Sequence, residues 1–106
     1  MASDAQATFR ALSDPTRRGI LRILAGSDQT IGQVAGHFDV TRPAIKKHLA
    51  ILEGARLIEV TTHGRERINH LKKDGFLPAV DWLSVFDIFW DDRLAALKST
   101  IERDLN

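Results

Sequence analysis

The feature that most constrains this chain is a pair of helix starts only eleven residues apart. Thr30 precedes an apolar stripe and Gln33 follows three residues later, the capping-box arrangement in which each side chain accepts the other residue's backbone N–H. Thr41 is a second N-cap, and Pro43 is acceptable in the first turn because no intrahelical acceptor is available there. The first helix must therefore be short and followed by a tight turn, which predicts a helix-turn-helix over residues 30–54.

The second of these helices has positively charged residues near its N-terminus. Its buried face is an apolar stripe at helical spacing, formed by Ile45, Leu49 and Leu52. Arg42, Lys46 and Lys47 lie in its first two turns, where the helix dipole disfavours positive charge. Phosphates and guanine edges would favour those cations, and in a DNA-binding helix-turn-helix the N-terminal residues of the second helix face the major groove. We therefore interpret this segment as a recognition helix.

Residues 57–71 favour a β-hairpin. The first half is rich in strand-forming residues, namely Leu57, Ile58, Val60, Thr61 and Thr62. His63 and Gly64 predict a tight turn, after which the chain returns as a second strand. In a DNA-binding domain this hairpin would be a wing, with Arg65 or Arg67 reaching the backbone or the minor groove.

Residues 76–104 show one long helical pattern with two apolar stripes. The first stripe contains Phe76, Val80, Leu83, Trp90, Leu94, Leu97 and Ile101, and the second contains Ala79, Trp82, Phe86 and Phe89. A straight helix of this length would span about 43 Å, more than the diameter of so small a domain. One stripe can face its own core, whereas the other needs a partner. We expect a dimerisation helix, with interface residues Trp82, Phe86, Phe89, Trp90, Leu94 and Leu97; the alternative is a helix wrapped wholly into a monomer core.

The composition fits one small soluble domain over residues 1–106. Charged residues make up 27% and hydrophobic residues 43%, which is ordinary for a globular protein. Cysteine is absent, so disulfides, thiolate metal sites and a cysteine nucleophile are excluded. No apolar run approaches the roughly 20 residues of a membrane span. The first twelve residues lack the apolar core of a signal peptide, so we expect a cytoplasmic protein with no membrane partner.

The positive charge is concentrated in one block. Residues 42–73 hold eight Lys and Arg against three Asp and Glu, whereas residues 74–106 hold three against seven. A clustered basic patch is typical of a nucleic-acid-binding surface. On charge alone, a solvated face of mixed charge explains the block equally well.

Together these segments resemble the ArsR family of winged-helix repressors. The matching residues are 11–24, 30–58 and the wing 63–71, and residues 81–101 are similar to a branch with a Trp-rich last helix. The expected fold is mainly α with a small β-hairpin: a winged helix-turn-helix of five helices, including a long C-terminal one. The resemblance implies a homodimer built from the first and last helices, which presents two recognition helices to a near-palindromic double-stranded DNA operator.

The resemblance also implies which residues meet DNA. The family's base-reading positions match Arg42, Pro43, Lys46 and Lys47, its phosphate-contacting positions match Thr41 and His48, and its wing contacts match Arg65 and Arg67. Many relatives carry Ser or Gln where Lys46 and Lys47 stand, so the operator of this chain should differ from theirs.

Many members of the family are metal sensors, but this sequence lacks their ligands. One sensor site uses a cysteine pair on the helix that matches residues 30–38, which is impossible here. The other uses Asp, His and Glu on the last helix, whereas every histidine of this chain precedes Phe76: His37, His48, His63 and His70. The acidic group Asp87, Asp91 and Asp92 is interpreted as a solvated helix face. We therefore predict no metal site and no other cofactor.

Three further alternatives concern function. Catalysis is not expected, because the serines have no assembled catalytic partners and no glycine-rich phosphate loop is present. A winged helix that binds protein instead of DNA is the main competing hypothesis, which the basic block and the wing arginines disfavour. The aromatic cluster of the last helix is interpreted as dimer core, with a binding site for an unknown small-molecule inducer as the alternative.

Overall fold

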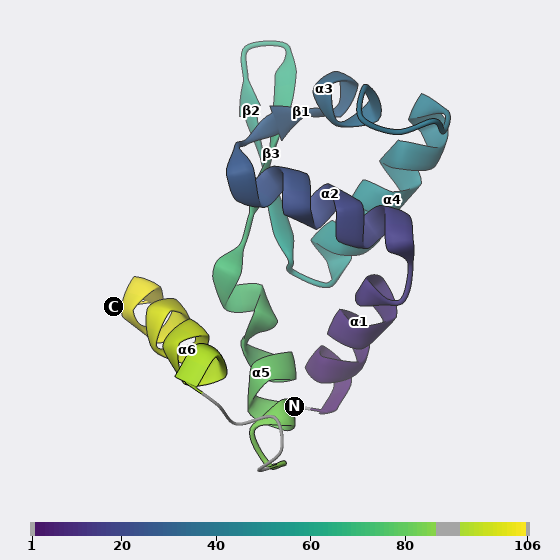
Figure 1. Cartoon of the computed structure of the whole chain (residues 1–106). Coiled ribbons are helices and arrows are strands. Elements are labelled where there is room, and N and C mark those ends of the chain that lie inside the picture. The colour runs from purple at the N-terminus through teal and green to yellow at the C-terminus, as the bar shows by residue number, and fades with distance from the viewer. Residues whose placement is uncertain (1, 87–91, 106) are drawn as a thin grey trace.

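The computed structural model describes residues 2–86 and 92–105. They form six α-helices, one 3₁₀-helix and three strands (Figure 1). The α-helices are α1 (Ala2–Leu12), α2 (Pro15–Gly26), α3 (Ile31–Ala35), α4 (Arg42–Gly54), α5 (Leu77–Leu83) and α6 (Asp92–Leu105). The strands are β1 (Gln29–Thr30), β2 (Ile58–His63) and β3 (Glu66–Leu71), and the 3₁₀-helix is η1 (Lys73–Phe76). The prediction of a mainly α winged helix-turn-helix with a small β-hairpin is confirmed.

The helix starts follow the local signals in the sequence. Thr30 N donates to Gln33 Oε1 at 2.9 Å and Gln33 N donates to Thr30 Oγ1 at 3.2 Å, so the capping box of α3 is complete. The side chain of Thr41 caps α4 by accepting from Ala44 N at 3.3 Å. These two caps set the positions of α3 and α4 and leave only a short turn between them.

The sheet is antiparallel with strand order β1-β3-β2. His63 pairs with Glu66, so the tight turn is formed by Gly64 and Arg65, one residue later than the expected His63-Gly64 turn. Gly64 has a φ of +67°, a conformation that glycine adopts without steric cost. The two-residue strand β1 was not predicted, because its only signal is its pairing with β3, where the buried Asn69 amide donates to Gln29 O at 3.1 Å.

The core lies between α2, α3, α4 and the sheet. Its buried residues are Ala11, Ile20, Leu21, Leu24, Val34, Ile45, Leu49, Leu52, Leu57 and Ile58. All three residues of the predicted inner stripe of α4 belong to this cluster, so α4 is held by its apolar face with its N-terminal cations left at the surface. None of the helices in the described residues combines the length and hydropathy that crossing a bilayer requires.

The expectation of one continuous helix over residues 76–104 is wrong. The described part of this region forms η1, α5 and α6, and α5 ends at Leu83. Ser84 Oγ donates to Asp81 O at 2.7 Å, and Phe86 N bonds Leu83 O at 3.1 Å, the tightened pattern of a terminating helix. The described residues therefore contain six α-helices and not the expected five, and none of the six is the expected helix of about 43 Å.

The chain folds back after α5. In Figure 1, α5 lies between α1 and α6. Ile101 of α6 is buried, and Lys98 lies 3.1 Å from Asp81 of α5 in an ion pair. Part of the apolar pattern that suggested a long helix is thus satisfied within the same chain.

Gly75 makes the close approach between η1 and the turn after α4. A Cβ at Gly75 would overlap the carbonyl group of Arg56, which is backbone and cannot rotate away. We expect Gly75→Ala to lower the free energy of unfolding by about 1–3 kcal/mol, the usual cost of overpacking. Gly54→Ala is the matched control, because nothing lies within 4 Å of its Cβ position. Urea unfolding that shows equal stability for both variants would contradict the close packing.

Candidate nucleic-acid interface

The recognition helix α4 carries its cations on different sides. Successive helical residues are about 100° apart, so neighbouring side chains diverge. Lys46 and Pro43 are exposed and line a groove between α4 and the sheet, whereas Lys47 is exposed outside that groove. Thr41 is exposed at the start of the helix. The predicted reading residues therefore form an outward surface with one flank turned toward the wing.

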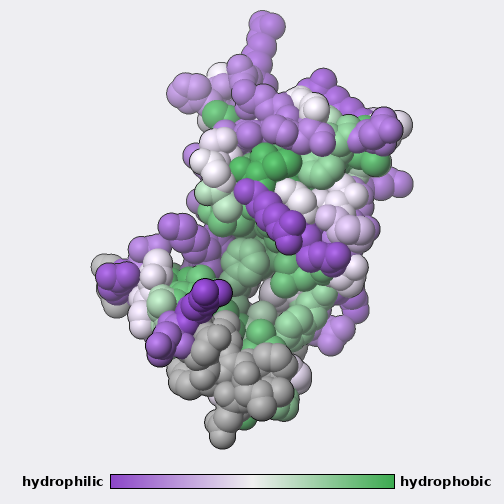
Figure 2. All heavy atoms as spheres, viewed as in Figure 1, coloured by the Kyte–Doolittle hydropathy of each residue, from purple (hydrophilic) through white to green (hydrophobic). Residues whose placement is uncertain are grey.

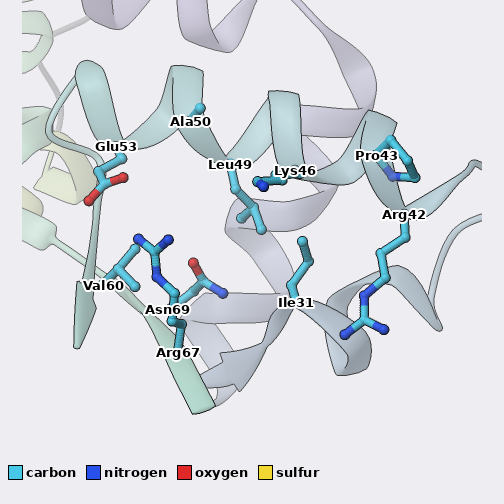
Figure 3. A pocket seen from close by; sticks show the side chains of 10 residues that line it. All are labelled: Ile31, Arg42, Pro43, Lys46, Leu49, Ala50, Glu53, Val60, Arg67 and Asn69. Carbon is cyan, nitrogen blue, oxygen red and sulfur yellow. The ribbon is translucent and has the colours of Figure 1, made fainter. Parts of the chain in front are cut away.

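The groove between α4 and the wing, the α4–wing groove, has a volume of about 570 Å³. Its lining residues are Ile31, Arg42, Pro43, Lys46, Leu49, Ala50, Glu53, Val60, Arg67 and Asn69 (Figure 3). Three of them are cationic and one is acidic. Among the described residues, Arg42, Lys46 and Arg67 take part in no ion pair. The groove thus combines an apolar floor with uncompensated positive charge.

The predicted wing residues occupy two separate places. Arg65 lies in the exposed turn at the tip of the hairpin, which extends past β1 in Figure 1. Arg67 lies on β3 opposite Thr62 and lines the α4–wing groove. The structure therefore brings Arg67 together with Lys46, while Arg65 stays apart from them.

Arg42 is directed toward α3. Its Nη2 atom lies 3.1 Å from the position that a Cβ would occupy on Gly32. The absence of a side chain at Gly32 therefore leaves the space that this guanidinium needs. Gly32 was not predicted as a functional residue, because its role depends on a residue in the neighbouring helix.

His48 lies on the opposite flank of α4 from Lys46. Its Nδ1 atom is 3.3 Å from a guanidinium nitrogen of Arg17 and 3.9 Å from Asp14 Oδ2. Arg17 also donates to the carbonyl oxygens of Arg10 at 3.1 Å and Ala11 at 2.8 Å. This network joins the end of α1, the start of α2 and the middle of α4, so it fixes the orientation of the recognition helix. Asp14 was predicted only as an N-cap, and Arg17 was not predicted at all.

The ionisation of Asp14 is shifted by its surroundings. The backbone N–H of Arg17 donates to its carboxylate at 3.0 Å and lowers the pKa of Asp14 below 3.8, and the positive charges of His48 and Arg17 act in the same direction. Partial burial opposes this shift. The ionised carboxylate therefore stabilises the folded state above the unfolded pKa, and the stabilisation is lost as pH falls through the folded pKa.

Asp14→Ala should lower the free energy of unfolding by about 1 kcal/mol at pH 7, because α2 loses its N-cap. The difference from the unmodified chain should shrink as pH falls below about 4, where the carboxylate becomes protonated. Denaturant unfolding at several pH values measures this. A difference that is the same at pH 7 and at pH 3 would show that the carboxylate charge is not responsible.

Histidine-containing contacts elsewhere are pairwise. Nδ1 of His70 lies 2.9 Å from Asp28 Oδ2, and its Nε2 lies 2.7 Å from Thr61 Oγ1. Within the described ranges, no three His, Cys, Asp or Glu side chains come together as a candidate metal site. Asp87 and Asp91 of the predicted acidic face lie outside the described residues.

The predicted dimerisation residues are only partly described. Trp82 is 51% exposed and Phe86 is 39% exposed, and their ring centroids lie 4.9 Å apart. Phe9 of α1, which was not among the predicted interface residues, packs edge-on against Trp82, with 5.6 Å between the ring centroids. Figure 2 shows apolar side chains gathered over α1 and α5. Leu97 is 46% exposed on α6, whereas Phe89, Trp90 and the side chain of Leu94 lie outside the described part of the structure.

Known proteins resemble this chain over most of its length. Residues 14–60 match the sequence profile of the family described as bacterial regulatory protein, arsR family. The transcriptional repressor SdpR of Bacillus subtilis (strain 168) is 38% identical over 78 residues, which cover 74% of this chain and 87% of that protein. An HTH-type transcriptional regulator of Mycobacterium tuberculosis (strain ATCC 25618 / H37Rv) is 32% identical over 96 residues, covering 91% of this chain and 87% of that protein.

A solved structure agrees with these relatives. It is an ArsR-like transcriptional regulator from Rhodococcus sp. RHA1, with 34% identity, a TM-score of 0.73 and coverage of 93% of both chains. Both the sequence relatives and this structure are regulators of transcription. The chain therefore belongs to the ArsR family of bacterial regulatory proteins and is a winged helix-turn-helix transcriptional regulator, not an enzyme.

Proposed function

We propose that this regulator is a homodimeric repressor that binds a near-palindromic DNA operator through α4 and the wing. The observation that carries the proposal is the group of cations at the exposed N-terminal half of α4, which make no ion pair within the described residues and two of which line a groove with Arg67 of the wing. The role of repressor is taken from SdpR, which is named as one. Because a regulator of bacterial transcription acts on DNA in the cytoplasm, the proposal includes a cytoplasmic location.

The predicted DNA-contacting residues have proposed roles according to their place on α4 or the wing. Pro43, Lys46 and Lys47 face the bases or flanking phosphates in the major groove, since the inner face of α4 is buried in the core. Arg42, Thr41 and His48 are proposed as contacts near the helix start and its flank; of these, His48 needs to turn away from Arg17 to reach a phosphate. Arg65 and Arg67 approach the sugar-phosphate backbone or the minor groove from the wing.

The exposed aromatic surface supports the dimer. Phe9, Trp82 and Phe86 form one contiguous cluster, and each of these residues is more than a third exposed. Large aromatic side chains contribute strongly to interfaces, and a contiguous exposed apolar patch marks an interaction site. A second copy would cover this cluster by twofold symmetry and so fix the separation of the two recognition helices.

The direct test is selection of bound duplexes from a random DNA pool. The expected product is an inverted repeat with one half-site for each α4. Its affinity should fall steeply as salt rises, because cations of α4 and the wing displace counterions from the phosphates. Recovery of no enriched sequence, together with tight binding to a protein partner, would support the alternative of a protein-binding winged helix.

Arg65→Ala and Lys46→Ala should have different effects on DNA binding. Arg65 is expected to contact phosphate, so its removal from both subunits should flatten the salt dependence by about two units without changing the preferred sequence. Lys46 is expected to face the bases, so its removal should relax preference at a symmetric pair of positions, by roughly 1–3 kcal/mol for each base contact.

Affinities of both variants are measured against salt on the selected operator and on every single-base change in one half-site. The unmodified protein under the same conditions is the control. If Arg65→Ala relaxes one base position while Lys46→Ala weakens all sequences equally, the roles of helix and wing are reversed.

A further inference from the structure

We propose that the α4–wing groove is a binding site for a small amphiphilic anion, a carboxylate or sulfonate with a compact apolar body, whose binding excludes DNA. The inference rests on the proposed function, because it places an effector on the surface assigned to the operator. It begins from the volume of the groove, about 570 Å³, which lies in the range of 300–1,000 Å³ typical of small-molecule sites.

The floor of the groove is more apolar than DNA binding requires. Ile31, Leu49 and Val60 come from α3, α4 and β2 and meet there, and Ala50 and Pro43 extend the apolar lining along α4. Figure 3 shows the side chains of Leu49 and Ile31 directed into the space between α4 and the sheet. A sugar-phosphate backbone is polar and would not cover these side chains, whereas an apolar ring or chain would.

The charges around the floor select an anion. Arg42, Lys46 and Arg67 are the cationic lining residues, against the single carboxylate of Glu53. In Figure 3, Glu53 lies at the end of the groove far from Arg42. An anionic group is therefore best placed near Arg42 and Lys46, with the apolar body extending over Leu49 toward Val60. A cation of the same shape would meet three like charges.

Such a ligand would compete with DNA directly. Lys46 is proposed to contact the major groove and also lines the α4–wing groove, so its ammonium group cannot serve both partners fully. An occupant would also fill the space between α4 and β3, the two elements that approach the duplex. The regulator would then release its operator without any change in the dimer interface.

The first experiment follows backbone amide chemical shifts of the full chain by nuclear magnetic resonance during titration with 2-naphthoate. The expected result is saturable shifts at Ile31, Leu49 and Val60. The matched control ligand is naphthalen-2-ylmethylammonium, which has the same ring system and the opposite charge and should give no saturable shifts there. Absence of saturation, or shifts centred on Phe9, Trp82 and Phe86, would overturn the proposal.

Two substitutions test the site itself. Ala50 is exposed and lines the groove, so Ala50→Trp should fill the groove and abolish probe binding while the amide spectrum stays that of a folded chain. Lys46→Ala should weaken 2-naphthoate about threefold to fivefold, the effect of one exposed ion pair. Lys47→Ala is the matched control, because Lys47 does not line the groove. Equal weakening by the two lysine substitutions would show that the probe responds only to net charge.

The last measurement is operator affinity with and without the probe. At 2-naphthoate concentrations ten times its dissociation constant, simple competition weakens DNA binding about elevenfold. Unchanged affinity, with the groove shown to be occupied, would overturn the exclusion of DNA by the ligand. Failure of the proposed function looks different: the protein would then select no DNA in the absence of the probe, while binding of 2-naphthoate could still be measured by the amide shifts.

Discussion

Insertion of five base pairs between the half-sites of the selected operator is expected to abolish tight binding. Two recognition helices in successive major grooves require half-site centres about 34–36 Å apart, one turn of the duplex. Five base pairs add about half a turn, which moves the second half-site to the opposite face of the DNA. The dimer would then bind through one α4 only, and loss of the second contact should weaken binding by about 10²-fold or more.

The control places the same five base pairs outside the two half-sites. That duplex has equal length and charge, so the non-specific contribution of its phosphates is matched. Its affinity should equal that of the original operator in a gel-shift or anisotropy titration. Equal affinity for the duplex with the internal insertion would mean that the half-sites are not read by one rigid dimer.

Leu52→Ala should lower the free energy of unfolding by about 2–5 kcal/mol. Leu52 is fully buried on the inner face of α4, where it belongs to the cluster that joins the helix to α2 and the sheet. Truncation removes buried methyl groups and leaves a cavity that close-packed neighbours cannot fill completely. Because α4 is held mainly by this face, the recognition helix loses its support together with the core.

Ile51→Ala is the control for this substitution. Ile51 is adjacent in the same helix and similar in size, but it is 42% exposed. Its truncation should cost much less, because few packed contacts are lost. Both variants are unfolded in urea at one fixed protein concentration, since dimerisation makes stability concentration-dependent. A cost of less than about 1 kcal/mol for Leu52→Ala would contradict the assignment of this residue to the core.

The helix-turn-helix was predictable because its determinants are local. An N-cap and its backbone donor are separated by three residues, as in Thr30 with Gln33 and Thr41 with Ala44, so the sequence alone indicates where α3 and α4 begin. The buried stripe of α4 follows from the helical period. Once Ile45, Leu49 and Leu52 face the core, the exposure of Lys47 follows without knowledge of any distant contact. The specific roles of the cations in DNA binding remain predictions.

The sequence by itself determined where α2, α3 and α4 begin, the hairpin and the position of the basic residues, because each depends on interactions within a few residues. Only the tertiary structure decided that the last helical region is interrupted after Leu83 and that α6 packs along α5. The spacing of apolar residues in the sequence can stay helical on both sides of such an interruption, so it does not reveal where the helix ends. The same holds for His48, whose ring meets Arg17 of α2. It holds also for the α4–wing groove, where Lys46 and Arg67 come together from segments 21 residues apart. Such contacts depend on how separate helices and strands pack together, and the spacing of residues within one element does not predict them.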